Sequence, residues 1–269
     1  IRKDWLDNLG MEEPKTIDEF GEVLRAFTED DPDGNGVNDT YGMIVTSYLD
    51  GPLNNLAVWM GSPNEWGYDE ANQTWKPWFM SEGFFEAMTK MREWYAAGYI
   101  NQNMATLDSN SWDNDFLNGL GGVQIDVADR ARRNATNILD NFPDAEVDVF
   151  GYVTKDANSA PTVWPTTGYN GYYVMPVAVQ TEEDLDFILS VLDECNGAEI
   201  SNLCNYGIEG RNYTIDEEGN AVKNTDPALT KEYNDLNQFA MGITSDGLKT
   251  AYANKTAEKV EEVYDENRN

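Results

Sequence analysis

The chain has 269 residues, of which 41% are hydrophobic and 25% charged, and its 49 acidic against 18 basic residues give a formal net charge of -31. This composition is typical of a folded protein, and the charge excludes nucleic acids and anionic membrane surfaces as partners, because both are bound through basic patches. The sequence contains no histidine, which removes the commonest general base, the commonest zinc ligand and any catalytic triad built on imidazole.

Capping residues and apolar spacing predict the elements of the first half of the chain. Thr16 and Glu19 form a capping box at the start of one helix, and Ser81 and Gly98 mark the start and end of another, whose broad apolar face we expect in the core. The predicted elements are a helix over 16–29, a buried strand over 41–46, short helical pieces over 53–60, a hairpin over 68–78 and a helix over 81–98.

The second half continues the alternation of helices and strands. Thr181 caps a helix that ends at Gly197, and Gly219 lies in the turn of a hairpin. The predicted elements are helices over 111–117, 130–141, 181–197, 226–240 and 245–265, strands over 123–127, 147–153 and 172–179, and a hairpin over 206–222. This alternation predicts an α/β layered architecture.

Two features bear on the compartment in which the protein works. Cys195 and Cys204 are nine positions apart, which permits either a small disulfide loop or two free buried thiols. The sequence begins at Ile1 without a basic segment or an apolar segment of the kind that directs secretion. We therefore expect that any secretion signal has been removed or was never part of this stretch.

The stretch from Asp31 to Asp39 matches the first nine positions of an EF-hand calcium loop. The predicted ligands are side-chain oxygens at positions 1, 3, 5 and 9 and a backbone carbonyl at position 7, namely Asp31, Asp33, Asn35, Asp39 and Val37. Position 12 is Gly42 instead of the usual bidentate glutamate, so Asp39 or a carboxylate from elsewhere would complete the shell. We expect one structural calcium ion, and an ordinary acidic turn is the alternative.

Aromatic residues gather near predicted turns and strand ends. Aromatic faces stack on the apolar faces of sugar rings while polar side chains hold the hydroxyls, so a cleft that mixes them suits an uncharged polyol. Trp59 and Trp164 are candidates on this ground, with burial in the core as the alternative.

Asp126, Asp129 and Arg130 are further candidates, because they follow a predicted strand and strand ends of α/β sheets line crevices. A helix-capping aspartate with a surface ion pair is the alternative for this group.

The opening from Ile1 to Phe20 resembles the middle of family 1 extracellular solute-binding proteins, which serve ATP-driven bacterial importers. The stretches Asp31–Gly36 and Asn205–Thr214 also resemble the long lipoprotein members of Gram-positive bacteria, so the resemblance spans most of the chain. It implies a helix-rich, periplasmic-binding-protein-like (type II) α/β lobe, with part of the second lobe missing. We expect the chain to lack the N-terminal part of such a protein.

The resemblance also implies a domain plan and further site residues. Residues 1–165 would be mainly the C-terminal lobe, 166–212 a crossover and return segment resembling part of the N-terminal lobe, and 213–269 hinge or C-terminal-lobe helices. It adds Tyr48, Asp50 and Tyr169 to the candidate ligand-binding residues, and it implies the same five calcium ligands, with Thr40 where the family has an acid.

The function implied by the resemblance is that of the extracellular substrate-binding component of an ABC-type importer, without catalytic activity. It would bind a carbohydrate, by preference an oligosaccharide, between two lobes. The implied partners are the solute and a membrane permease, and we expect a monomer held at the cell surface by a lipid anchor outside this chain. A carboxylate-dependent glycoside hydrolase and a calcium-stabilised adhesion or scaffold module remain alternatives. The negative charge disfavours an acidic ligand.

Overall fold

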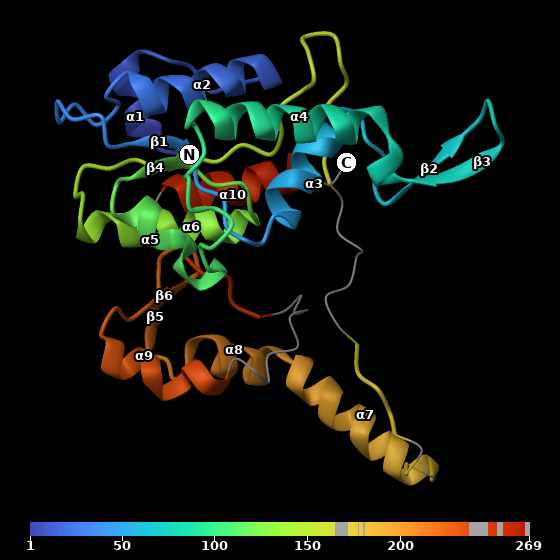
Figure 1. Ribbon diagram of the computed structural model, residues 1–269. Coiled ribbons are helices and arrows are strands. Elements are labelled where there is room, and N and C mark those ends of the chain that lie inside the picture. Colours follow the sequence, from blue (N-terminus) through green and yellow to red (C-terminus); the bar gives the residue numbers. More distant parts are fainter. Residues whose placement is uncertain (165–171, 177, 180, 237–246, 252–254, 267–269) are drawn as a thin grey trace. The chain divides into compact units, whose positions relative to one another are not determined.

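The computed structural model describes residues 1–164, 172–176, 178–179, 181–236, 247–251 and 255–266, apart from the side chains of residues 50, 110, 261 and 264–266 (Figure 1). The chain forms two compact units, and each is described by itself. Unit 1 comprises Ile1–Thr167 and Ala253–Asn269, and unit 2 comprises Gly168–Tyr252.

Unit 1 is a helix-rich α/β unit. Its helices are α1 (Lys3–Leu9), α2 (Ile17–Glu29), α3 (Asp50–Trp59), α4 (Glu82–Ala97), α5 (Trp112–Leu117), α6 (Ala128–Asn137) and α10 (Lys255–Glu266), with 3-10 turns η1 (Trp78–Met80), η2 (Ser109–Ser111) and η3 (Ile138–Asp140). Its strands are β1 (Tyr41–Met43), β2 (Trp66–Asp69), β3 (Thr74–Pro77) and β4 (Gly121–Val123). β1 pairs with β4 in parallel, and β2 and β3 form the predicted hairpin. In Figure 1, β1 and β4 lie between a layer containing α1, α2 and α4 and a layer containing α5, α6 and α10.

Helix α2 anchors the core of unit 1. The Thr16 hydroxyl accepts a hydrogen bond from the Glu19 amide, and the Glu19 carboxylate accepts one from the Thr16 amide, so the predicted capping box is present. Phe20 and Phe27 are completely buried. A Cβ atom on Gly122 of β4 would lie 2.2 Å from the Phe27 ring, so a glycine is needed where the strand meets the helix.

Some expectations for unit 1 are wrong in detail. The strand predicted over 123–127 ends at Val123, and the next four residues form the connection to α6. The strand predicted over 147–153 is not a strand and makes only an isolated bridge, between Val147 and Arg2. Short apolar runs of this kind can be buried without a neighbouring strand to pair with, which is why periodicity alone misassigned them.

Only part of the predicted apolar face of α4 is in the core. Met91 and Trp94 are buried, whereas Phe85 is 62% exposed. The reason lies at Gly83, because a Cβ atom there would come within 2.7 Å of the Met60 carbonyl oxygen. The first turn of α4 therefore lies close to the end of α3, and the side chains of Phe85 and Met88 are exposed.

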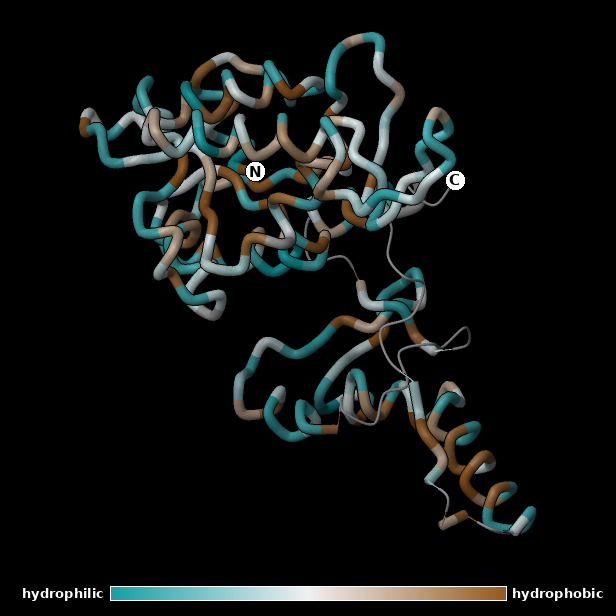
Figure 2. The backbone as a smooth tube through the Cα atoms, turned by 45° about the vertical axis from the view of Figure 1, so that its right-hand side comes forward, coloured by the Kyte–Doolittle hydropathy of each residue, from teal (hydrophilic) through white to brown (hydrophobic). Residues whose placement is uncertain are grey.

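Unit 2 contains α7 (Glu182–Asn196), α8 (Ala198–Tyr206), β5 (Tyr213–Ile215), β6 (Ala221–Lys223) and α9 (Pro227–Asn234). The expected hairpin is present as β5 and β6, and its turn contains Gly219 at φ 87°. Tyr206, Tyr213 and Ala221 form a small core. Figure 2 shows that hydrophobic positions recur along α7, yet none of its described side chains is buried. Both cysteines are free thiols.

Sequence patterns missed one helix of unit 2 and predicted a strand that is absent. Helix α8 was not predicted, and residues 172–176 and 178–179 do not form the expected strand. Unit 1 ends at Thr167, close to the predicted boundary at 165, whereas the predicted boundary at 212 falls inside unit 2 and residues from 253 onward return to unit 1. The assignment of these units to the lobes of a longer protein stays a prediction.

Candidate ligand-binding site

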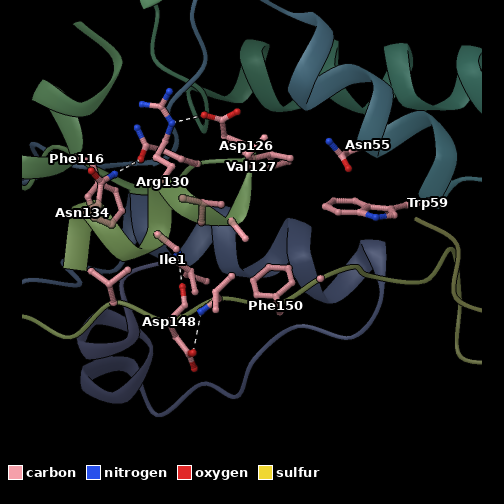
Figure 3. A pocket seen from close by; sticks show the side chains of 18 residues that line it. Ile1, Asn55, Trp59, Phe116, Asp126, Val127, Arg130, Asn134, Asp148 and Phe150 are labelled. Atoms are coloured by element: carbon pink, nitrogen blue, oxygen red, sulfur yellow. Dashed lines mark hydrogen bonds and ion pairs between the residues drawn. The ribbon is translucent and has the colours of Figure 1, made fainter. Parts of the chain in front are cut away.

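A cavity of about 100 Å³ lies in unit 1 where the connections that follow β1 and β4 come together. Because the two strands are parallel, their carboxyl ends meet at one edge, which brings α3 beside the start of α6. The segment 147–151 closes the cavity. The side chains that define its character are Asn55, Trp59, Asp126, Arg130, Asn134 and Phe150 (Figure 3).

Arg130 is held by two carboxylates beside this cavity. Its Nε donates to Asp126, and its Nη1 donates to the Asp113 Oδ1 at 2.6 Å. The guanidinium carbon lies 4.6 Å from the centroid of the Trp112 ring, within the range of a cation–π contact. Burial lowers the pKa of Arg130, but the bonds to Asp126 and Asp113 outweigh burial and raise it above its usual value. The cation is therefore fixed in place, with two negative charges around it.

A chain of amide groups continues from this cluster. Asn134 Nδ2 donates to Gln124 Oε1 at 2.6 Å and to Asp113 Oδ1 at 3.3 Å, and Gln124 Nε2 donates to the Trp112 carbonyl at 3.1 Å. Asn134 is buried, and its Oδ1 accepts no hydrogen bond from any described residue. A buried acceptor of this kind requires a donor from water or from a ligand.

The loop over residues 31–39 collects three carboxylates around an amide. Asn35 Nδ2 donates to Asp33 Oδ2 at 2.8 Å and to Asp39 Oδ1 at 3.3 Å, and the Asp31 carboxylate accepts from the amides of Asn35 and Gly36. Gly36 has φ 79°, a conformation that favours glycine. Burial raises the pKa of Asp33, and the neighbouring carboxyl groups of Asp31 and Asp39 raise it further.

Within the described residues, no group of three Asp, Glu, Cys or His side chains is arranged to hold a metal ion. The donor chemistry nevertheless fits a hard cation, because the loop offers three carboxylates and an amide oxygen and the crowding of negative charge disfavours its empty form. In this structure the side-chain amide of Asn35 donates to the carboxylates of both Asp33 and Asp39.

Comparison with curated proteins identifies relatives, although no protein-family model matches the chain. The chain is 36% identical over 251 residues to lipoprotein LipO of Bacillus subtilis and 31% identical over 269 residues to the polygalacturonan/rhamnogalacturonan-binding protein YtcQ of the same organism. These matches cover 90% and 95% of the chain and 49% and 52% of the two proteins, so the chain spans about half the length of the relatives. A 39-residue stretch, 14% of the chain and 7% of the other protein, is 56% identical to the fructooligosaccharide ABC transporter substrate-binding protein FusA of Streptococcus pneumoniae.

Solved structures show the same fold. An extracellular solute-binding protein from Bifidobacterium longum subsp. infantis matches with a TM-score of 0.66 at 22% identity, and the alginate-binding protein AlgQ2 with 0.63 at 19% identity. Each match covers 100% of this chain and 56% of the other. The chain is a relative of extracellular solute-binding proteins. The resemblance of Ile1–Phe20 and the expected fold class are thereby confirmed.

The solute-binding fold brings three of the predicted ligand-binding residues to one cavity. Trp59, Asp126 and Arg130 all line it, from α3 and from the region that follows β4. Trp59 is also a core residue, because it is buried and lies edge-on to Phe20 at 6.3 Å between ring centroids. Its Nε1 has no hydrogen-bond partner among the described residues. Trp59 therefore belongs both to the hydrophobic core and to the lining of the cavity.

Tyr48 and Asp129 do not line the cavity. Tyr48 is half exposed in the segment before α3. The carboxylate of Asp129 is exposed and pairs with Arg133 at 3.2 Å, as an ordinary surface ion pair does. Asp50 opens α3, but its side chain is outside the described part of the chain.

Of the two remaining candidates, the structure describes Trp164 but not Tyr169. Trp164 is partly buried and does not line the cavity, although Thr162, two residues earlier, donates from its hydroxyl to the Val58 carbonyl at 2.8 Å. Tyr169 lies outside the described residues.

Sequence reasoning missed Asp113, Gln124 and Asn134. Asp113 and Asn134 lie inside helices, where a polar residue normally indicates a solvent-facing position. Gln124 was placed inside the strand predicted over 123–127. A usable signal existed in the spacing of Asp126 and Arg130, which are four residues apart and ion-paired, but nothing local pointed to a second carboxylate from α5.

Proposed function

We propose that the chain contributes the ligand-binding surface of an extracellular solute-binding protein that delivers a carbohydrate to an ABC-type importer. The observation that carries the proposal is the cavity in which Trp59 and Phe150 lie beside Asp126, Arg130 and Asn134. Aromatic faces with a few polar groups fixed in orientation are what a sugar ring requires. The printed names of YtcQ and FusA, a polysaccharide-binding and a fructooligosaccharide-binding protein, support an oligosaccharide.

The same proposal includes a cell-surface location through a lipid anchor, a membrane permease as partner and a monomeric state. LipO is named a lipoprotein, which supports the anchor. Among the helices of the described residues, none has the length and apolar character needed to cross a membrane.

We propose no catalysis at this site. A glycosidase needs one protonated and one ionised carboxyl group on either side of a glycosidic bond. Asp113 and Asp126 both accept from the guanidinium of Arg130, so both carboxyl groups are bound to one cation instead of lying on either side of a bond to be cleaved. The relatives YtcQ and FusA are named as binding proteins, in agreement with this proposal.

The test is calorimetric titration of the chain, and of any longer protein that contains it, with a panel of neutral and acidic oligosaccharides. We expect saturable binding with the sugar recovered unchanged by chromatography, and Arg130→Met should weaken binding about tenfold or more, because it removes the guanidinium donors and leaves two partly buried carboxylates unpaired. Arg133→Met is the matched control, since Arg133 lies on the same helix outside the cavity. Silence across the panel from the folded protein contradicts the carbohydrate function, and cleaved sugar contradicts the absence of catalysis.

We also propose that the loop 31–39 binds one structural calcium ion through Asp31, Asp33, Asn35, Asp39 and the carbonyl of Val37. Two observations support this proposal. The carboxylates of Asp33 and Asp39 both lie within hydrogen-bond distance of the Asn35 side chain, and the pKa of Asp33 is raised. A bound cation would neutralise the negative charge that these carboxylates bring together. An ion bound only by the folded state stabilises it by about 2.7 kcal/mol at a hundredfold excess over its dissociation constant.

The thermal midpoint of the chain, measured with calcium and with chelator, tests this proposal. We expect a rise with calcium that Asp33→Asn abolishes. Asp156→Asn, in an exposed turn of unit 1 where Asp156 accepts from the amide of Asn158, is the matched control and should keep the full response. An unchanged midpoint at millimolar calcium would leave the loop as an acidic turn.

A further inference from the structure

Two groups beside the cavity bear on the charge of its ligand: the Arg130 cation, which is already engaged, and the buried Asn134 Oδ1, which has no hydrogen-bond partner among the described residues. We infer that this cavity selects an uncharged, hydroxyl-bearing sugar unit over a uronate, and that Asp113 is the residue that sets this preference. The inference rests on the proposed carbohydrate function and adds the charge class of the ligand. It also separates this chain from its relative YtcQ, whose name gives an acidic polysaccharide as the ligand.

The charged groups at the cavity leave no cation free for a carboxylate, among the residues that the structure describes there. Asp148 lines the cavity and is balanced by Lys259 Nζ at 2.8 Å. The backbone nitrogen of Ile1 donates to the Asp148 carbonyl oxygen at 3.0 Å, so it is already engaged. Arg130 is the remaining cation, and it is shared by Asp113 and Asp126. The cluster therefore carries one excess negative charge.

The hydrogen-bonding groups show which kind of ligand group the site needs beside Arg130. Asn134 Oδ1 is a buried acceptor without a partner among the residues that the structure describes, and its orientation is determined because Nδ2 donates to both Gln124 and Asp113. A hydroxyl can donate to Asn134 Oδ1 and accept from another group at the same time. An ionised carboxylate can only accept, so the group of the ligand that serves Asn134 is a hydroxyl and not a carboxylate.

Asp113 contacts both the cation and the buried amide beside the cavity. Its Oδ1 accepts from Arg130 Nη1 and from Asn134 Nδ2, so one carboxylate both balances the cation and turns the acceptor of Asn134 away from itself. The guanidinium has five N–H donors, so groups not used by the aspartates can still donate to a neutral sugar oxygen. The cavity volume of about 100 Å³ compares with roughly 10–15 Å³ needed to hold one water molecule, so it has room for the hydroxyl-bearing edge of one sugar unit.

The experiment uses matched pairs of ligands, each an oligouronide and its carboxyl-reduced, neutral form of the same length and linkage. Galacturonate, glucuronate and mannuronate backbones are titrated into the wild-type chain, and into any longer protein that contains it. We expect the neutral member of a pair to bind about tenfold or more tightly than the acid, since like charges brought together oppose binding. Added salt should strengthen binding of the acid and leave the neutral sugar nearly unchanged, because salt screens repulsion.

The variant Asp113→Asn keeps the shape of the side chain and removes its charge, so it should narrow the ratio of the two affinities by about threefold or more. Asp140→Asn, an exposed position in η3, removes the same charge away from the cavity and should leave the ratio unchanged. The ratio of affinities is the readout, because a loss of packing alone would weaken both members of a pair equally.

Three results are distinguishable. A preference for the neutral member that salt and Asp113→Asn both reduce supports the inference. A wild-type protein that binds the acid equally or more tightly, with an affinity that falls as salt rises, overturns the inference and leaves the carbohydrate function standing. Binding of neither member of any pair, nor of any sugar in the wider panel, by the folded wild-type protein overturns both.

Discussion

Helices α2 of unit 1 and α7 of unit 2 begin alike and end in different environments. Each is capped by a threonine whose hydroxyl accepts from the amide three residues later, and each has acidic residues in its first turn and apolar residues at helical spacing. Phe20 of α2 is completely buried, whereas Phe187 of α7 is 69% exposed. Periodicity and capping are therefore sufficient for a helix, but burial requires another element to cover the apolar face.

The largest expected difference between the two helices is the cost of removing an aromatic ring. Phe20→Ala should lower the free energy of unfolding of unit 1 by about 3–5 kcal/mol, because Phe20 packs edge-on to Trp59 and Trp94. Phe187→Ala should change stability by less than about 0.5 kcal/mol. Urea unfolding followed by circular dichroism measures both, and tryptophan fluorescence reports unit 1 alone, because all eight tryptophans lie at or before position 164. Equal costs would mean that the apolar face of α7 is covered, and the contrast would be wrong.

A smaller effect is expected at the two caps. Thr16→Ala should cost about 1 kcal/mol and destabilise unit 1 as a whole, because α2 is packed into its core. Thr181→Ala removes an equivalent bond, but the loss should appear as fraying of α7, which has no buried side chain among its described residues. Amide hydrogen exchange resolved by residue distinguishes the two, and the serine variants, which keep the hydroxyl, should behave like wild type. Global destabilisation by Thr181→Ala would show that α7 is integral to a packed core.

The smallest expected effect concerns an exposed ion pair that distinguishes unit 2. Glu232 accepts from Arg211 Nε at 2.7 Å and from Asn212 Nδ2 at 3.1 Å, and these bonds, Arg211 first, lower its pKa from 4.5 to about 2. Since the pKa is lower in the folded state, the pair stabilises unit 2 fully above about pH 4.5 and loses this contribution as pH falls toward 2.

Titration of the side-chain carboxyl groups by NMR checks the ion pair directly. The midpoint of Glu232 should lie near pH 2 and return to an ordinary value in Arg211→Gln. An ordinary midpoint for Glu232 in the wild-type chain would mean that solvent competes successfully with Arg211.

The candidate site could be predicted in part. Asp126 and Arg130 were found because they follow a strand pattern, even though the strand itself ends earlier, at Val123. Asp113 and Asn134 could not be found, because they lie within helices and acquire their roles only when α5 and α6 pack beside the end of β4. The expectation that aromatic residues stack on sugars selected Trp59 and Trp164 alike, because both side chains can stack. Only their positions in the fold separate them, since Trp59 lines the cavity and Trp164 does not.

Local chemistry in the chain was sufficient for the capped helices, the two hairpins, the glycine-containing turn of the acidic loop and the relation to solute-binding proteins, because each depends on residues close together in sequence. Tertiary structure alone decided which apolar faces are buried, where the strand before α6 ends and which carboxylates surround Arg130. The physical reason is that burial and charge pairing join residues from separate elements, and only the parallel pairing of β1 with β4 brings those elements to one edge.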